Sequence, residues 1–301
     1  MATIIDTMQN TGSVMHQAKF IDVNGTRTRY YELGSGEPML LIHGATFSGQ
    51  GSANTWTLNL EGLSRKFHVF APDRLGNGMT DNPKRDEDYT VQAVVQHLYE
   101  FTQAVGIESM HVVGQSLGAY MATRLTLEHL GMVKTLTLID TASLAPDVGS
   151  HAERMGRVNE GRPDGVKEYI RFYWERMSHF TDHVTEDYVD AGYFMETQPK
   201  ALETKARWEA GASRIWAESQ RTQKEETLAW IGEGRLQVPT LIYWAATDPS
   251  AILEQGIKLF DIIREKTPRT QMHVVSRGGH FHYREYPDEF NTVVTNFIEA
   301  S

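Results

Sequence analysis

A serine between two glycines constrains the fold of this chain more than any other feature of its sequence. The stretch Gly-Gln-Ser-Leu-Gly occupies residues 114–118, follows the apolar run 110–113 and precedes 119–125, which has the pattern of a helix. Strand, tight turn and helix around Gly-x-Ser-x-Gly form a nucleophile elbow, in which both glycines allow two backbones to approach closely. Ser116 then stands at the end of the strand, beside the N–H groups that begin the helix. Glycine and serine are common, so the five residues alone also fit an ordinary strand-to-helix turn.

Apolar strands alternate with helices on both sides of this turn. Residues 20–31 predict a hairpin that turns at Asn24-Gly25. The remaining predicted strands are 39–42, 68–73, 110–113, 133–140, 239–245 and 271–275, and the predicted helices are 58–66, 90–105, 119–125, 255–266 and 288–300. This alternation predicts an α/β fold with a mostly parallel, eight-stranded sheet that helices cover on both faces.

One long segment interrupts the alternation. Residues 142–234 contain helical patterns and no convincing strand, which predicts a helical lid inserted between two parts of a core domain, 1–141 and 235–301. Such an insertion lies over the carboxyl edge of the sheet, where α/β folds bind their ligands. Residues 1–16 are polar and aperiodic, and we expect them to form a loose tail.

A serine nucleophile needs a base and an acid that orients the base. The expected base is His280, which follows two glycines and the last predicted strand, whereas His273 lies inside that strand and His282 lacks flanking glycines. Two acids compete, because both Asp248 and Asp140 directly follow strands. Asp248 is the preferred acid, since the usual chain order is serine, acid, histidine and its loop precedes the histidine-bearing strand. Asp140 is expected to cap the start of the lid or to serve as a reserve acid.

The oxyanion of the reaction needs two backbone N–H donors. One is expected from Leu117, directly after Ser116, and the other from Ala45, in the loop that follows the strand ending at His43-Gly44. The side chain of His43 is expected to be structural.

Aromatic side chains are concentrated in the predicted lid. For the walls of the site we expect Gln115, Trp174, Trp208, Trp216 and Phe281, because aromatic groups suit a flat, apolar ligand. Most lid aromatics are nevertheless expected to be core residues. A carboxylate anchor could come from the lid arginines, although the acidic residues between them favour solvated positions for most. These arginines are Arg171, Arg176, Arg207, Arg214 and Arg221.

Composition narrows the function further. The net charge of −10 over 301 residues argues against nucleic acids and anionic membranes as partners. The chain contains no cysteine, so a thiolate metal site is excluded. No dinucleotide or phosphate-binding glycine motif is present, so no cofactor is expected. His179 and His183 lie one helical turn apart and could form a metal pair, but no third ligand stands at a recognisable spacing, so no metal is expected. Without a signal peptide or an apolar span, we expect a cytoplasmic protein that binds a small-molecule substrate, and homo-oligomerisation stays open.

Together these motifs resemble those of the α/β-hydrolase superfamily, over almost the whole chain. They are His43-Gly44, the run Asp73 to Gly78, residues 114–118, Asp248 and Gly279-His280. Within the superfamily the chain resembles the meta-cleavage-product hydrolases in its loop 44–56, in Gly-x-Ser-x-Gly, and in Gly279-His280 followed by an aromatic residue. Those enzymes cleave a carbon–carbon bond in vinylogous 1,5-diketones. The resemblance therefore implies a serine hydrolase for such a diketone. Gln115 and Phe281 depart from that family, which usually has Asn and Trp there, so carboxylester or lactone hydrolysis stays an alternative. A ligand receptor that retains a hydrolase pocket, and cofactor-free oxygenation, are the alternatives from other classes.

Overall fold

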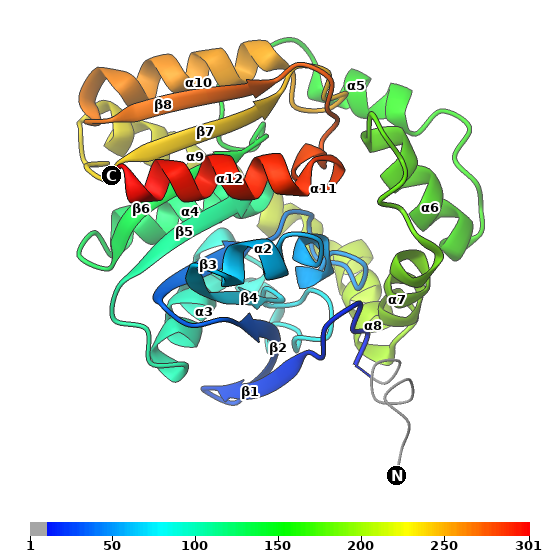
Figure 1. Ribbon diagram of the computed structural model, residues 1–301. Helices are drawn as coiled ribbons and strands as arrows, with labels where there is room; N and C mark the ends of the chain where they lie inside the picture. The colour runs from blue at the N-terminus through cyan, green and yellow to red at the C-terminus, as the bar shows by residue number, and fades with distance from the viewer. Residues whose placement is uncertain (1–10) are drawn as a thin grey trace.

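The predicted strands form one mixed sheet in a computed structural model that describes residues 11–301 (Figure 1). The strand order is β1-β2-β4-β3-β5-β6-β7-β8. Strands β3 to β8 run parallel to one another, and β2 is antiparallel to both β1 and β4. The strands are β1 Lys19–Val23, β2 Thr26–Leu33, β3 Glu37–Ile42, β4 Phe67–Pro72, β5 Met110–Gln115, β6 Val133–Ile139, β7 Thr240–Ala245 and β8 Thr270–Val275. The α/β class and the eight-stranded, mostly parallel sheet are thus confirmed.

The hairpin turns where its sequence predicts, and the segment before it is tied down. Val23 pairs with Thr26 across Asn24-Gly25, whose φ angles of 50° and 78° are those that a two-residue hairpin turn requires. The prediction of a loose tail is wrong for the described part, because the backbone N–H of Val14 donates to the Tyr31 hydroxyl at 3.0 Å. The rest of the predicted tail, residues 1–10, lies outside the described residues.

Helices cover both faces of the sheet because alternate residues of each central strand point to opposite sides. On β3, Leu40 and Ile42 belong to a core formed with α3, α4, α9 and α10, whereas Met39 and Leu41 pack with α2 and α12. These helices are α2 Leu60–Ser64, α3 Val91–Ala104, α4 Leu117–Glu128, α9 Ser213–Gly232, α10 Leu253–Lys266 and α12 Pro287–Glu299. The helix predicted over 58–66 is shorter in the structure, where α2 covers residues 60–64. A short 3-10 helix, η1 Ala53–Trp56, precedes it.

The segment between β6 and β7 is helical, as its sequence predicts. It contains α5 His151–Val158, α6 Val166–Met177, α7 Glu186–Glu196, α8 Pro199–Arg207, the π-helical turn η3 Trp208–Ala212, and α9. Figure 1 shows α5 to α7 beyond the carboxyl ends of β7 and β8. Helix α9 returns to the sheet, where its Ile231 lies in the core. The boundaries of this segment as a separate lid domain stay a prediction.

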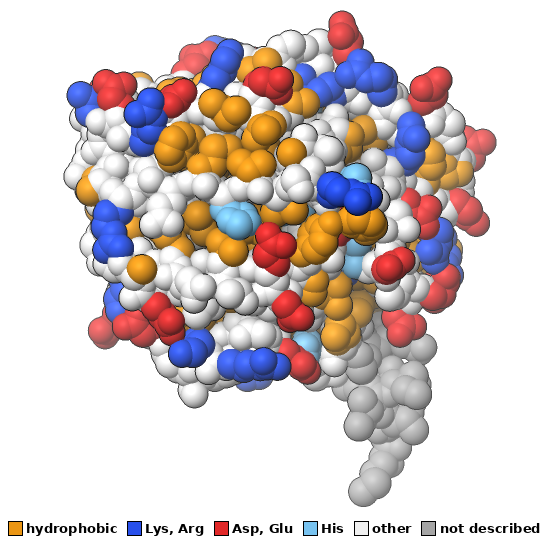
Figure 2. All heavy atoms as spheres, turned by 45° about the horizontal axis from the view of Figure 1, so that its top comes forward, with side chains coloured by type: hydrophobic (Ala, Val, Ile, Leu, Met, Phe, Trp, Pro, Cys, Tyr) orange, Lys and Arg blue, Asp and Glu red, His pale blue; other side chains and the backbone are white. Residues whose placement is uncertain are grey.

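The surface carries charges of both signs. Figure 2 shows them interspersed with apolar side chains. Two of the apolar side chains that remain exposed are Ile257 of α10, at 45%, and Val274 of the edge strand β8, at 42%. Across residues 11–301, none of the helices has the length and hydropathy of a membrane span.

Candidate active site

The turn at Ser116 has the backbone of a nucleophile elbow. Ser116 has φ 53° and ψ −122°, a conformation that a non-glycine residue adopts only where its surroundings enforce it. A Cβ atom on Gly114 would lie 2.7 Å from the backbone N of Ala119, and one on Gly118 would meet the carbonyl groups of Ile42 and His43. Only glycine fits at either position, as the sequence predicts. Ser116 is partly exposed, and α4 begins with the next residue.

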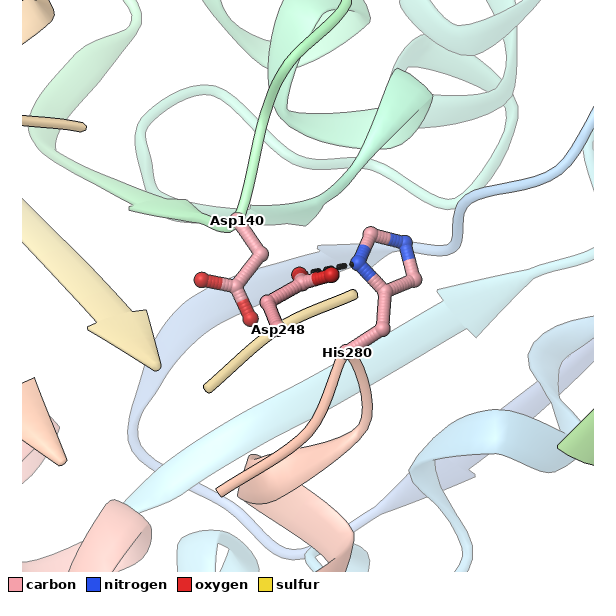
Figure 3. A group of neighbouring side chains, drawn as sticks. All are labelled: Asp140, Asp248 and His280. Carbon is pink, nitrogen blue, oxygen red and sulfur yellow. Dashed lines mark hydrogen bonds and ion pairs between the residues drawn. The ribbon is translucent and has the colours of Figure 1, made fainter. Parts of the chain in front are cut away.

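His280 and Asp248 meet beside the carboxyl edge of the sheet. Nδ1 of His280 donates to Oδ2 of Asp248 at 2.6 Å (Figure 3). The other carboxylate oxygen of Asp248 accepts three hydrogen bonds, from the backbone N–H groups of Ser250 and Ala251 at 2.7 and 2.9 Å and from the Ser250 hydroxyl at 2.9 Å. Both side chains are buried, at 6% and 4% exposure. Asp248 is therefore held in one orientation by four donors.

Burial and pairing act in opposite directions on these two groups. Burial alone would lower the pKa of His280, but the charge of Asp248 and the hydrogen bond to it raise that pKa above its usual value. Burial alone would raise the pKa of Asp248, and the His280 imidazolium and the backbone donors lower it instead. An ionised acid beside a histidine of raised basicity is the arrangement that a histidine base requires.

The glycines before His280 let its loop reach the end of α6. A Cβ atom on Gly279 would lie 2.6 Å from the Cα atom of Ser178, and the backbone N–H of His280 donates to the carbonyl of Met177 at 2.7 Å. The end of α6 therefore fixes the histidine loop.

The loop after β3 is braced from behind by a buried arginine. Ala45 has φ 70°, and its carbonyl and that of Gly44 both accept from Nη2 of Arg74. Nε2 of His43 accepts from the backbone N–H of Arg74 at 3.0 Å, so His43 serves the loop, as expected. Burial lowers the pKa of the Arg74 guanidinium to about 9. Leu117 begins α4, where backbone N–H groups have no partner within the helix.

Asp140 lies in the same cluster and does not cap the lid. The prediction that Asp140 caps the start of this helical segment is wrong, because Ser150 caps its first helix, α5. Asp140 is fully buried, has φ 40°, and accepts from the backbone N–H of Ala245 at 2.9 Å. Oxygen or nitrogen atoms of Asp140, Asp248 and His280 all lie within 4.8 Å of one another (Figure 3). That spacing could suit a metal ion, but hydrogen bonds already occupy both oxygens of Asp248.

Comparison with known proteins identifies the family. A family model described as the alpha/beta hydrolase fold matches residues 37–285. This chain belongs to the alpha/beta hydrolase family. The hydrolase is 26% identical over 284 residues to a 2-hydroxy-6-oxo-6-(2'-aminophenyl)hexa-2,4-dienoic acid hydrolase from Metapseudomonas resinovorans, a match that covers 93% of this chain and 90% of the relative. It is 24% identical over 310 residues to a proline iminopeptidase from Heyndrickxia coagulans, covering 95% of this chain and 100% of that relative.

Solved structures agree with this placement. The meta-cleavage product hydrolase of Pseudomonas fluorescens IP01 matches the hydrolase with a TM-score of 0.74 and 26% identity, covering 94% of this chain and 98% of that one. The resemblance inferred from the motifs is confirmed: the chain belongs to the family, and proteins named as meta-cleavage-type hydrolases are among those similar to it.

The predicted wall residues of the hydrolase fall into two separate groups. Phe281 stacks on Trp174 with ring centroids 3.8 Å apart, and both are buried against the α2 and α12 side of the core. Trp208 and Trp216 pack instead on Phe47, at 6.0 and 5.2 Å between centroids, and belong to the opposite core. The structure does not bring these four aromatics together, and the expectation that lid aromatics are mainly core residues holds for Trp174 and Trp216, at 6% and 3% exposure.

Gln115 does not line an open wall of the site; its side chain contacts the histidine loop. It is 2% exposed, and its Nε2 donates to the carbonyl of His280 at 3.2 Å. A Cβ atom on Gly44 would collide with its side-chain oxygen. Gln115 therefore connects the elbow, the histidine loop and the loop that carries Ala45.

The five arginines named as possible carboxylate anchors are directed to the surface of the hydrolase, as the interleaved acids predict. Arg171 pairs with Glu186, Arg207 with Glu203, and Arg221 with Glu218 and Glu225. Arg176 donates to backbone carbonyls of α5, and Arg214 is exposed.

One neighbour of the site was not among the sequence predictions. His282, set aside as the base because it lacks flanking glycines, is 0% exposed, and its Nδ1 lies 2.8 Å from Oδ2 of Asp140 and 3.1 Å from the Gly279 carbonyl. Burial lowers the pKa of His282 to about 4, so its imidazole is neutral. The only signal in the sequence was its spacing of two residues from His280.

Proposed function

We propose that this chain is a serine hydrolase that cleaves a carbon–carbon bond in a vinylogous diketone of the meta-cleavage type. The observation that carries the proposal is the buried Asp248–His280 hydrogen bond of 2.6 Å, at the sheet edge where the strained elbow presents Ser116. Relatives named as dienoic acid and dienoate hydrolases, each about a quarter identical to this chain, support the substrate class.

Each residue of the proposed site has one task. Asp248 holds the tautomer in which Nδ1 of His280 carries the proton, so that Nε2 accepts the proton of the Ser116 hydroxyl. The Ser116 oxygen attacks the carbonyl carbon, and the backbone N–H groups of Leu117 and Ala45 stabilise the negative charge on the carbonyl oxygen. The bond to the leaving group breaks, and His280 returns the proton to that group. Water, deprotonated by His280, then releases the acyl group as a carboxylic acid and restores Ser116.

A diketone needs one step before this attack. Its dienol must become a ketone, so that the bond to be broken leaves an electron pair that the neighbouring carbonyl group stabilises. His280 is the base within the proposed site that moves this proton. Ester hydrolysis needs no such step, because its alkoxide leaving group takes the proton directly.

The second candidate is hydrolysis of an uncharged ester or lactone. The observation that favours it is the position of three of the arginines named as possible anchors: Arg171, Arg207 and Arg221 form ion pairs with acidic residues on the surface. A dienoic acid carries a carboxylate, and a binding site for it is expected to offer a cation or several N–H donors. An ester or lactone needs no such anchor.

The deciding experiment compares kcat/KM for a chromogenic meta-cleavage dienone and a short aryl ester. A preference for the dienone of about a hundredfold, roughly 2.7 kcal/mol of transition-state stabilisation, would support carbon–carbon cleavage. A preference for the ester by the same factor would overturn that substrate class in favour of the second candidate.

The control variants separate chemistry from binding. Ser116→Ala is expected to lower kcat/KM by several orders of magnitude on whichever substrate is turned over. Ser64→Ala, whose hydroxyl donates to a backbone carbonyl on the exposed side of α2, is the matched control and should retain full activity. Near-normal activity of Ser116→Ala would refute the nucleophile. If the unaltered protein turns over neither substrate and takes up no oxygen with them, the ligand-receptor alternative gains.

A further inference from the structure

Two carboxyl groups meet at the ends of neighbouring parallel strands. Asp140 directly follows β6, and Asp248 lies in the loop after β7, which pairs with β6 in parallel register up to Ile139 and Tyr243. Parallel strands bring their carboxyl ends to one edge, so both acids reach the same place. Figure 3 shows the Asp140 carboxyl beside that of Asp248, whose far side carries the hydrogen bond to His280.

The two carboxyl groups have very different support. Asp248 accepts four hydrogen bonds, three of them on one oxygen. Asp140 accepts one from the backbone, from Ala245. Its other oxygen lies 2.8 Å from the imidazole of His282, without the alignment of a hydrogen bond.

The groups that face Asp140 come from every element packed against it. They are Asp248 after β7, His280 after β8, His282 and Tyr283 of α11 His282–Glu285, and Tyr243 of β7. None of these five is a permanent cation. Burial, and the charge of Asp248, raise the pKa of Asp140 well above its usual range. Oxygen atoms of the two carboxyl groups lie within 4.8 Å of each other. Keeping both groups ionised at this distance in a buried site would cost too much free energy.

We propose that Asp140 is a positioning residue that shares one proton and one negative charge with Asp248, so that the carboxyl pair, rather than Asp248 alone, orients His280. In the resting pair the proton sits on Asp140 and the charge on Asp248, where the four donors stabilise it. When His280 takes the Ser116 proton, the imidazolium is balanced by that single charge, and the pair keeps its own proton.

A shared charge has a consequence for variants of either acid. In Asp140→Asn, Asp248 stays ionised and the charge beside His280 is unchanged. In Asp248→Asn, the negative charge that adds to the effect of burial on the pKa of Asp140 is gone, so on this proposal Asp140 releases its proton to solvent and supplies the charge from a poorer position. The double variant has no charge to offer.

The first test reads the proton directly and needs no substrate. The infrared C=O stretching band of a protonated carboxyl group, measured at neutral pH, is expected in the unaltered protein and should be lost in both Asp140→Asn and Asp248→Asn. Asp147→Asn, which alters an exposed aspartate, is the matched control and should keep the band. A band that survives in Asp248→Asn would mean that burial alone protonates Asp140, and a band that survives in Asp140→Asn would place the proton elsewhere. Either result overturns the proposal.

The second test is a double-mutant cycle on kcat/KM, and it rests on the proposed function because it requires His280 as the base. Asp140→Asn is expected to remain within about fivefold of the unaltered enzyme, and the double variant to fall at least about tenfold below Asp248→Asn. Equal activity of the double variant and Asp248→Asn, with both folded by circular dichroism, would overturn the proposal. If no variant and no substrate gives activity, the proposed function fails while the infrared result still decides the question of the shared proton.

Discussion

Among the ion pairs of arginine and lysine that the structure describes, the one between Arg29 and Asp73 is the most completely buried. Removing its cation should destabilise the fold by about 3–5 kcal/mol. Both side chains are 0% exposed, and Nη1 of Arg29 donates to both carboxylate oxygens at 3.0 and 3.1 Å. Nη2 donates to the Gly12 carbonyl at 3.1 Å, the Tyr31 hydroxyl at 2.9 Å and the Asn54 side-chain oxygen at 2.8 Å. One guanidinium therefore satisfies five acceptors from four parts of the chain.

The expected loss of unfolding free energy stays in this range because Asp73 keeps other hydrogen-bond donors when the arginine is removed. In Arg29→Met, the carboxylate still accepts from the backbone N–H groups of Ala53 at 2.7 Å and Met79 at 2.9 Å. Methionine fills much of the arginine volume, so the loss comes from unpaired polar groups rather than from a cavity. A loss of about 3–5 kcal/mol is a large part of the 5–15 kcal/mol that typically stabilises a domain.

The assay is urea unfolding followed by circular dichroism, on the unaltered protein, Arg29→Met, Asp73→Asn and the double variant. Each single variant leaves one buried ion without its partner, whereas the double variant leaves none. The double variant should therefore lose at least about 2 kcal/mol less than the sum of the single losses. A single loss below about 1 kcal/mol, or losses that simply add, would refute the argument that the pair is electrostatically coupled.

Three further predictions concern the site. The pKa of His280 is raised and only the neutral imidazole can act as base, so kcat/KM should fall as the pH drops through a midpoint above the usual 6.5. Asp248→Asn should move that midpoint to lower pH. A pH–rate profile without this shift would contradict the pairing. Gly118→Ala should abolish most activity and lower the melting temperature, since its methyl group meets two strand-end carbonyls, and an unchanged melting temperature would contradict this close approach. Phe281→Ala removes the stack on Trp174, so urea unfolding should show a loss of about 3–5 kcal/mol in the free energy of unfolding. Phe281→Trp should lose clearly less, and equal losses would show that the stack contributes little.

Most of the fold could be predicted from the sequence because its strands are short, continuous apolar runs. A strand such as Leu40 to Ile42, buried on both faces, leaves no ambiguity about its environment. The N-terminal segment was mispredicted because its fixation depends on distant side chains. Gly12 and Val14 are held by Arg29 and Tyr31, and no local pattern reports such contacts.

The candidate site was predictable where a residue type is forced by geometry. Gly114 and Gly118 are required by backbone contacts, and their spacing around Ser116 is visible in the sequence. The walls were less predictable, because helical spacing identifies which aromatic residues are buried but not which core they join. Trp174 and Trp216 are both buried on helices of the segment between β6 and β7, but they belong to different core clusters.

The pair of Asp140 and Asp248 could be predicted only in part from the sequence. Its two members could be found in the sequence, since Asp140 and Asp248 each follow a strand, and the adjacency of β6 and β7 makes them neighbours. Which of them carries the charge depends on the number of donors around each, four for Asp248 and one backbone N–H for Asp140, and donors are set by loop conformation. Both acids at this edge can therefore contribute: the carboxylate with more hydrogen-bond donors takes the charge, and the other keeps the proton that makes their proximity tolerable.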